Sequence, residues 1–194
     1  MRIDHIAYRT KDREKTSKFF IDALGYRIQE RFTIDFDDGT CAECIALEPP
    51  EKLTGNPPWT TMQVHYIETL EGMKEKLQIY YMPPEIFVSD GKPGSIVGDW
   101  VAARGGIGGI HHQAFQVESV KETMKDWQEK GYAEFSSNEP MICPEDGLIQ
   151  VFTKPIDILG GIVLEFIERS GHGFCNKNVK ALMLSTKEKN NAKS

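Results

Sequence analysis

The stretch Ile3-Asp4-His5-Ile6-Ala7-Tyr8 returns later in the chain as Ile110-His111-His112-Gln113-Ala114-Phe115, with every position displaced by 107 residues. Both copies are short and mostly apolar, which predicts a β-strand for each. The same order of elements follows each copy: a segment with helical periodicity, and after it several strand-like runs. The repeat therefore predicts a chain that is built twice from one strand–helix–strands unit.

A helix is predicted after each copy. The second helix begins with a capping box, in which Ser119 and Glu122 would satisfy two free backbone amides. Its apolar stripe has the spacing i, i+4 and i+7 and consists of Val120, Met124 and Trp127. The first helix follows residues 10–12, and we expect its buried face to carry Phe20, Ala23 and Leu24.

The strands that complete each unit are predicted from bounded runs of apolar residues. They cover residues 26–35, 41–47, 62–67 and 77–82 in the first unit, and 133–136, 148–153 and 162–167 in the second. The first unit is longer, and its Pro- and Gly-rich segments place an insertion at about 49–76. Ser95 caps a short helix between the units, and a last helix, at about 178–187, has an apolar face of Val179, Leu182 and Met183.

The composition is ordinary for a globular protein of 194 residues, because 40% of them are apolar and 27% are charged. A net charge of −6 with scattered Lys and Arg argues against nucleic acid or an acidic membrane surface as the main partner. The apolar runs are too short to span a bilayer, and residues 1–5 lack the apolar run of a secretory signal. We expect a flexible tail at 187–194, which is polar.

The four cysteines do not suggest a disulfide framework in a chain of this length. Cys41 and Cys44 form a C-x-x-C pattern, but they lie in a predicted strand, where residues three apart point to opposite faces. Two thiolates on opposite faces cannot share a metal ion. We therefore expect reduced cysteines and a cytoplasmic protein.

Glu165 interrupts the apolar strand of residues 161–167. Burying a carboxylate alone costs several kcal/mol or forces its neutralisation, so the residue needs a partner. An ion pair with an arginine, or a strand edge that faces water, would meet this need. The alternative is a metal ion, whose charge offsets the burial.

Two histidines could complete a metal site with Glu165. His5 and His112 hold equivalent positions in the repeat, and equivalent residues face each other across an internal two-fold axis. His111 should point to the opposite face of its strand. His65 and His172 have no repeat partner and are interpreted as surface or structural residues. Two histidines and one carboxylate are typical of non-haem Fe(II), and the set also serves Mn, Co or Ni, while zinc is less favoured.

The repeated start and the late Leu164-Glu165-Phe166 resemble the vicinal-oxygen-chelate superfamily, whose members pair two βαβββ modules around one metal. Residues 148–155, 164–169 and 173–182 are similar, in order, to the C-terminal pattern of one branch, the 4-hydroxyphenylpyruvate dioxygenases. The resemblance implies an α+β fold: two paired modules form a curved mixed sheet around the metal, and a C-terminal helix follows. The modules would cover 1–106 and 107–170, with a lid helix and tail at 171–194.

The resemblance also assigns roles to individual residues. It implies that His5, His112 and Glu165 bind the metal, which would be Fe(II), with Co, Mn, Ni or Zn as alternatives. Gln150 would lie in the substrate pocket, and Phe174 would precede the helix that covers it. These two are the expected catalytic-site residues.

The chain also departs from that branch. It has one pair of modules rather than two, His111 replaces the usual glutamine, and the stretch between His112 and Glu165 lacks the branch's insertion. In lacking the insertion, and in the stretches 95–100 and 109–112, it is similar to methylmalonyl-CoA epimerase. The epimerase chemistry normally uses a fourth protein ligand, for which Gln78 is the best candidate.

Three hypotheses follow. The first is a dioxygenase acting on a 2-oxo acid. The second is an epimerase, isomerase or lyase acting on an acyl-CoA-like substrate with the metal as Lewis acid. The third is a metal-independent binding protein on the same fold. The modules could pair within one chain or between two, so a homodimer is also expected.

Overall fold

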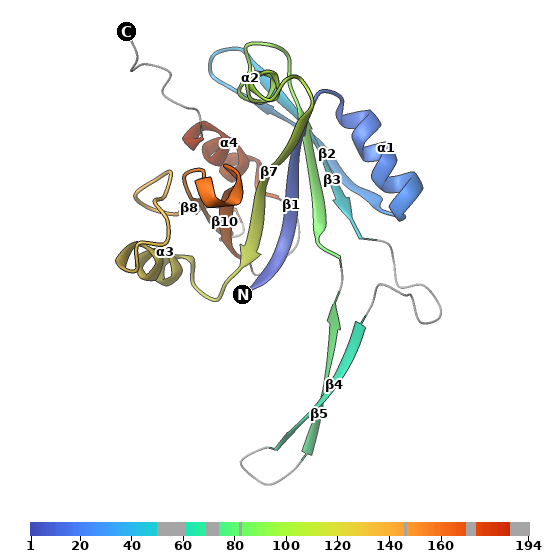
Figure 1. The fold of residues 1–194 in the computed structure, drawn as a ribbon, viewed down its shortest axis with the longest axis vertical. Helices are drawn as coiled ribbons and strands as arrows, with labels where there is room; N and C mark the ends of the chain where they lie inside the picture. The colour runs from blue at the N-terminus through green and yellow to red at the C-terminus, as the bar shows by residue number, and fades with distance from the viewer. Residues whose placement is uncertain (50–60, 69–73, 82, 146, 170–173, 187–194) are drawn as a thin grey trace.

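A computed structural model describes residues 1–49, 61–68, 74–81, 83–145, 147–169 and 174–186. Its main feature is a curved mixed sheet of eight strands, in the order β2-β3-β6-β1-β7-β10-β9-β8 (Figure 1). The order is symmetric about its centre: from β1 outward the neighbours are β6, β3 and β2, and from β7 outward they are the equivalent strands β10, β9 and β8. The two modules therefore meet at β1 and β7, the two copies of the repeated stretch.

Each module has the order βαβββ, which confirms the expected fold class. The first consists of β1 (Arg2–Thr10), α1 (Arg13–Leu24), β2 (Arg27–Asp35), β3 (Cys41–Glu48) and β6 (Glu85–Asp90). The second consists of β7 (Gly108–Gln116), α3 (Val120–Glu129), β8 (Met141–Ile142), β9 (Ile149–Phe152) and β10 (Val163–Glu168). Helix α2 (Ile96–Ala103) connects them, a short 3-10 helix spans Asp157–Leu159, and α4 (Asn176–Ser185) follows. The division of the chain at 106/107 stays a prediction.

The strands of the first module differ from the expected set. The expected strand at 77–82 falls on β5 (Lys74–Tyr81), which pairs only with β4 (Thr61–Glu68) in a separate two-stranded sheet. This hairpin projects from the main sheet (Figure 1). The module is completed instead by β6, a six-residue run between Pro84 and Gly91 that the sequence analysis did not assign to a strand. In the second module, 133–136 contributes only a single bridge, between Phe135 and Thr153.

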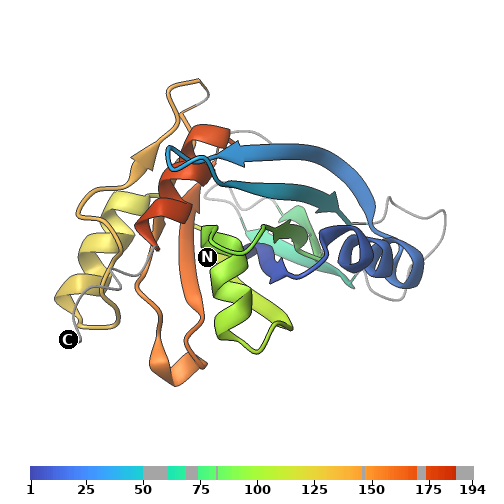
Figure 2. The same cartoon turned by 90° about the horizontal axis from the view of Figure 1, so that it is seen from above.

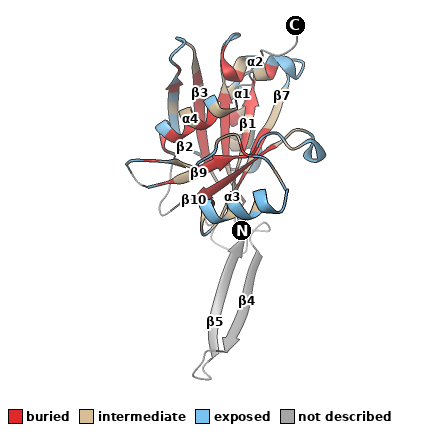
Figure 3. Cartoon of the chain, turned by 90° about the vertical axis from the view of Figure 1, so that its left-hand side faces the viewer, coloured by how far each residue is buried: buried red, intermediate tan, exposed pale blue. Residues whose placement is uncertain are grey.

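Helices α1 and α3 cover the outer face of the sheet, since strand residues pack against each of them in a separate apolar cluster. One of the two expected capping bonds of α3 is present, since Ser119 accepts a hydrogen bond from the Glu122 amide, and Val120 and Met124 are buried. The outward side of α3 is exposed (Figure 3). The expected face of α1 is only partly right: Phe20 packs against the sheet, but Leu24 is 51% exposed and Ser17 is buried.

Helix α4 lies on the inner, concave side of the sheet. It contacts β2 at one end of the sheet and β8 and β9 at the other. Seen from above, it lies between the strands of the two modules (Figure 2). Val179, Leu182 and Met183 are buried, as the expected apolar face requires. The helix therefore closes the trough that the curved sheet forms.

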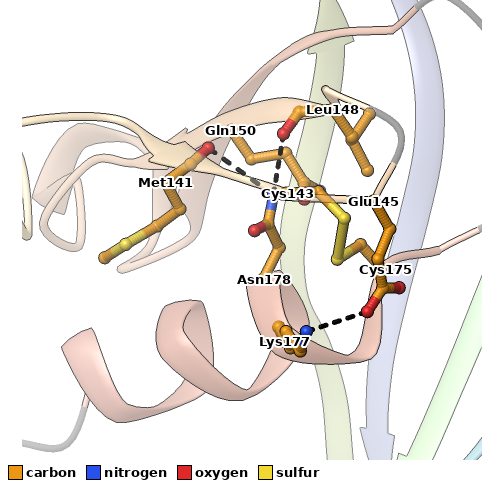
Figure 4. The surroundings of a disulfide bond; sticks show 8 residues. All are labelled: Met141, Cys143, Glu145, Leu148, Gln150, Cys175, Lys177 and Asn178. Atoms are coloured by element: carbon orange, nitrogen blue, oxygen red, sulfur yellow. Dashed lines mark hydrogen bonds and ion pairs between the residues drawn. A yellow bond between two sulfur atoms is a disulfide. The ribbon is translucent and has the colours of Figure 1, made fainter.

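One disulfide contradicts the expectation of reduced cysteines. Cys143 and Cys175 are bonded, which ties the turn before β9 to the residue that precedes α4 (Figure 4). The two cysteines are 32 residues apart, and their spacing did not predict the bond. The packing of α4 against the sheet brings them together. Cys41 and Cys44 are free.

The structure leaves several expectations untested. His172 and the expected tail at 187–194 lie outside the described residues. His65 belongs to β4, in the separate hairpin. Over the part of the chain that the structure describes, no helix is both long and apolar enough to cross a membrane.

Candidate metal centre

Three buried side chains meet on the inner face of the sheet. His5 Nε2 lies 3.2 Å from His112 Nε2, and each of these nitrogens lies 3.2 Å from Glu165 Oε2. The exposed fractions of the three residues are 2%, 8% and 1%. The structure thus brings together the three residues that the repeat and the buried carboxylate had singled out.

The pairing of three adjacent strands explains this convergence. Strand β1 runs antiparallel to β7, with Ala7 opposite His112, and β10 runs parallel to β7, with Glu165 beside Ala114. Because side chains alternate along a strand, residues two apart share a face. His5 therefore points to the same side as Ala7, and Glu165 to the same side as Ala114 and His112. Residues on the opposite face pack under α1 and α3, among them Ile6, Tyr8 and Phe166.

The donor atoms fit a divalent metal ion. An ion with bonds of about 2.0–2.2 Å to nitrogen and oxygen, held at right angles, separates neighbouring donors by about 3 Å. The three separations of 3.2 Å are close to this value. No fourth His, Cys, Asp or Glu joins the group within the described residues. The set therefore has the chemistry and spacing of a three-ligand centre.

His5 is oriented by a partly buried ion pair between Asp4 and Arg169. Its Nδ1 lies 2.8 Å from Asp4 Oδ1, and Arg169 donates to both carboxylate oxygens of Asp4 at 2.7 and 3.0 Å. A carboxylate on the outer nitrogen fixes the imidazole ring and makes Nε2 a better ligand. Phe174 adds an edge-on ring contact to His5, with centroids 5.1 Å apart.

Glu165 is held by a chain of amides that leads to α4. Gln150 Nε2 donates to Glu165 Oε1 at 2.6 Å, and Asn178 Nδ2 donates to Gln150 Oε1 at 3.0 Å. Asn178 also donates to the carbonyl oxygen of Leu148 at 3.0 Å. Gln150 is 1% exposed and lines the pocket. Both ends of its amide are already bonded, and its expected role toward a substrate stays a prediction.

The protonation of the group is set by its internal charges. Burial alone would lower the pKa of His5, but the carboxylates of Glu165 and Asp4 raise it to about 9. Burial would raise the pKa of Glu165, but the interactions with His5 and His112 lower it. Burial lowers the pKa of His112, and His5 and Arg9 add to the effect. Without metal, His5 therefore carries the proton that balances Glu165.

The prediction for His111 is wrong. It faces the same pocket as His112, with its Nδ1 2.8 Å from His112 Nδ1. The register explains this: Ala7 is opposite His112 and Tyr8 is opposite Ile110, so His111 is one extra residue in β7. Such a bulge places two neighbouring side chains on one face. Burial lowers the pKa of His111 well below its usual value, with Arg9, His112 and Arg104 adding to the effect, so it is neutral.

A pocket extends from this group along β1. Its walls include the aromatic residues Phe87, Phe152 and Phe174, and α4 covers it with Val179, Leu182 and Met183. Its polar residues away from the cluster are Arg9, Ser89 and His111. Phe174 thus lies in the pocket wall, against His5.

Gln78, the candidate fourth ligand, is not part of the eight-stranded sheet. It lies in β5, where it pairs with Val64 in the separate hairpin. The register identifies a different equivalent of Glu165 in the first module: Phe87 lies beside Ala7, as Glu165 lies beside Ala114. An apolar ring therefore occupies the place from which the first module could supply a fourth ligand.

Sequence reasoning missed Arg9, Asp4 and Asn178. Arg9 could have been found, because it lies four residues after His5 and must share its face of the strand. Asp4 and Asn178 gave no signal, because their roles depend on contacts across the fold. A second cluster, Cys143, Glu145 and Cys175, offers no thiolate, since its sulfurs are bonded to each other.

Comparisons with known proteins agree with this fold. The family model described as the Glyoxalase/Bleomycin resistance protein/Dioxygenase superfamily matches residues 2–142. A methylmalonyl-CoA epimerase structure is similar with a TM-score of 0.58 and 21% identity, over 88% of this chain and 97% of the other. The epimerase from Mycobacterium tuberculosis gives a TM-score of 0.56 and 14% identity, over 88% and 89% of the two chains.

A mutant of 4-hydroxymandelate synthase from Streptomyces coelicolor gives a TM-score of 0.68 and 16% identity, over 95% of this chain and 52% of the other. No curated protein matches. The neighbours thus include structures related to both branches that the sequence resembles, and at these identities they show the fold alone. The family match covers more than half of the chain, and the chain therefore belongs to the Glyoxalase/Bleomycin resistance protein/Dioxygenase superfamily.

Proposed function

We propose that this protein is a metal-dependent dioxygenase that acts on a 2-oxo acid, with Fe(II) held by His5, His112 and Glu165. The observation that carries the proposal is the three-donor cluster, with Phe87 in place of a fourth ligand. Two histidines and one carboxylate with open positions are typical of non-haem Fe(II) oxygenases. Co, Mn, Ni or Zn remain alternative ions for the same donors.

When bound, Fe(II) supplies the open positions for a chelating 2-oxo acid and O₂, together with the electrons that O₂ activation requires. The protein's residues supply the setting. Asp4 and Gln150 orient two of the ligands from the outside. Phe174 and the apolar face of α4 exclude water from the pocket, which protects reactive species from side reactions. We propose α4 as a lid on this basis.

The alternative is an epimerase, isomerase or lyase, in which the metal acts as a Lewis acid on an acyl-CoA-like substrate. Its support is the similarity to methylmalonyl-CoA epimerase, which extends over nearly the whole of both chains. The epimerase chemistry normally uses a fourth protein ligand, and Gln78 remains the candidate from the sequence. The small inner pocket suits a compact 2-oxo acid and therefore favours the dioxygenase.

The remaining parts of the proposal concern partners and location. We propose a small-molecule substrate, a homodimer, no binding to nucleic acid or membranes, and a cytoplasmic location. The Cys143–Cys175 bond counts against that compartment, because disulfides are rare in the cytosol. Titrating the free thiols of protein made in a reducing host would test it: four thiols would agree with the proposal, and two with an oxidising compartment.

The decisive experiment begins with metal analysis of protein purified without oxygen, and continues with O₂ uptake in the presence of a panel of 2-oxo acids. We expect about one Fe(II) per chain and O₂ consumption with at least one compound. The variant Glu134→Gln serves as a control, since Glu134 lies on the surface. Metal without O₂ uptake, combined with exchange of the α-proton of an acyl-CoA in D₂O, would replace the dioxygenase with the alternative.

A further inference from the structure

Arg9 is a buried cation in the wall of the pocket. It is 3% exposed and lies on the same face of β1 as Ala7 and His5. A guanidinium is costly to bury, and arginines in protein interiors are normally paired with a carboxylate. The partners of Arg9 therefore need to be accounted for.

The described residues give Arg9 only weak partners. Its guanidinium donates to Thr186 Oγ1 at 3.4 Å and lies 5.7 Å from the centre of the Trp100 ring. Neither partner carries negative charge. No ion pair joins Arg9 to a carboxylate within the described ranges. The other residues that influence it most are the cation Arg104 and the buried thiol of Cys44.

Arg9 nevertheless keeps its charge at neutral pH. Burial, with Arg104 adding to it, lowers its pKa from 12.5 to about 9, which is still well above 7. A guanidinium presents five N–H donors in a planar fork that matches a carboxylate or a phosphate. Only one donor contact to a described residue, at 3.4 Å, is seen. The polar side chains nearest along the pocket wall, Ser89 and His111, are neutral groups, so they would not repel an anion.

We propose that Arg9 forms an anion-binding subsite of the pocket, and that the substrate carries a second anionic group at the end remote from the metal. This inference rests on the proposed function, because it names the substrate class of the same site. The substrate would be a 2-oxo acid with a further carboxylate, or another oxyanion, that pairs with the guanidinium.

The spacing along β1 sets the length of such a substrate. Four residues of strand separate the Cα atoms of His5 and Arg9 by about 13 Å. A metal bond takes up about 2 Å and an ion pair about 4 Å of this span, which leaves roughly 7 Å. The two carboxyl carbons of an extended six-carbon 2-oxo dicarboxylate are about 6 Å apart. 2-Oxoadipate is therefore the matching probe, and 2-oxohexanoate is the same chain without the second charge.

The first test compares these two compounds as substrates of the Fe(II)-loaded protein. We expect kcat/KM to be about 10- to 100-fold higher for 2-oxoadipate, which is the effect of one charge-assisted interaction in a buried site. Arg9→Met should abolish the preference, and Arg9→Lys should retain part of it. Arg31→Met is the control, because Arg31 is exposed and does not line the pocket. It should leave the preference unchanged.

The second test does not depend on turnover. Adipate should bind to the metal-free wild-type protein in a calorimetric titration, and Arg9→Met should lose this binding. The same variant should be at least as stable as the wild type, because it removes a buried charge that lacks an anionic partner. If Arg9 had only a structural role, Arg9→Met would be less stable than the wild type, and the ratio of kcat/KM for 2-oxoadipate to that for 2-oxohexanoate would not change. If Arg9→Met does not fold, the ratio of kcat/KM for the two oxo acids is measured with Arg9→Gln instead.

The outcomes separate the two proposals. Adipate binding that depends on Arg9, without O₂ uptake from either oxo acid, would retain the subsite and overturn the dioxygenase. Equal turnover of both oxo acids, with Arg9→Met slowing both alike, would retain the dioxygenase and overturn the subsite. Absence of adipate binding to the wild type would also overturn the subsite.

Discussion

The last strands of the two modules hold equivalent places but present different side chains to the pocket. On β10 the inward residue is Glu165, while on β6 the residue at the equivalent register is Phe87. Both are buried, with exposed fractions of 1% and 4%. The repeat thus supplies two symmetric histidines and only one carboxylate. A symmetric fold therefore carries an asymmetric site. The side without a ligand is the side of Phe87 on β6.

The two histidines differ in the same way. The outer nitrogen of His5 contacts the Asp4 carboxylate, while that of His112 contacts neutral His111. A negative partner strengthens a histidine ligand more than a neutral one does. The first module therefore provides the better supported histidine, and the second provides the carboxylate.

Removing the carboxylate should have the largest effect. Glu165→Ala deletes one of three donors and the negative charge, so metal affinity should fall by more than 100-fold, beyond the usual loss for an outer partner. The strand around it is apolar and can still pack, so the variant should remain folded. Metal content and circular dichroism would check this, with Glu134→Gln as control. Full metal content in the folded variant would contradict the three-ligand centre.

Weakening the support of His5 should have the next largest effect. Asp4→Asn removes the charge behind the ring, and we expect a 10- to 100-fold loss of metal affinity. Arg169, which pairs with Asp4 at 2.7 Å, also loses its charged partner, so stability should fall as well. His111→Asn should have a smaller effect on affinity, because it replaces one neutral partner with another. Competition with a chelator would rank the variants, and the reverse order would contradict the comparison of the two histidines.

Making the two modules more alike should strengthen metal binding. Phe87→Glu places a carboxylate at the register equivalent of Glu165, so metal affinity should rise about tenfold. O₂ uptake should fall, because the fourth ligand occupies a position that the reaction needs. Phe87→Leu is the control, since it keeps the position apolar. An unchanged affinity in a folded Phe87→Glu protein would show that this side chain does not face the centre.

Metal affinity should also depend on pH. In the metal-free protein, the carboxylates of Glu165 and Asp4 raise the pKa of His5 to about 9, and metal binding must displace that proton. Affinity should therefore fall about tenfold for each pH unit below about 9. The stability of the metal-free protein should show the opposite trend. The contribution of protonated His5 is complete below about pH 6.5 and is lost as the pH rises toward 9. Calorimetry at several pH values would measure both trends.

The predictable part of this molecule is the part that repeats. The repeated stretch predicted β1 and β7, and the buried carboxylate in an apolar strand predicted a partner for Glu165. The inward position of His111 could not be predicted, because it depends on one extra residue in β7 that shows only when β1 is paired with it. Strand β6 was missed because its place in the sheet depends on its pairing with β1 and β3, which the sequence does not show.

The Cys143–Cys175 pair likewise depends on how α4 docks, and it leads to the prediction with the smallest expected effect on the metal. Cys143→Ser should lower the free energy of unfolding by about 4 kcal/mol, as expected for opening a loop of this length. Metal affinity should change by less than threefold, because the donors lie on β1, β7 and β10, and α4 reaches Glu165 only through Asn178 and Gln150. Chemical denaturation and a chelator competition would measure the two quantities, with Cys41→Ser as the control at a free cysteine. A 100-fold loss of affinity would mean that the bond holds α4 as part of the metal centre itself, and the helix would then be a structural wall rather than a lid.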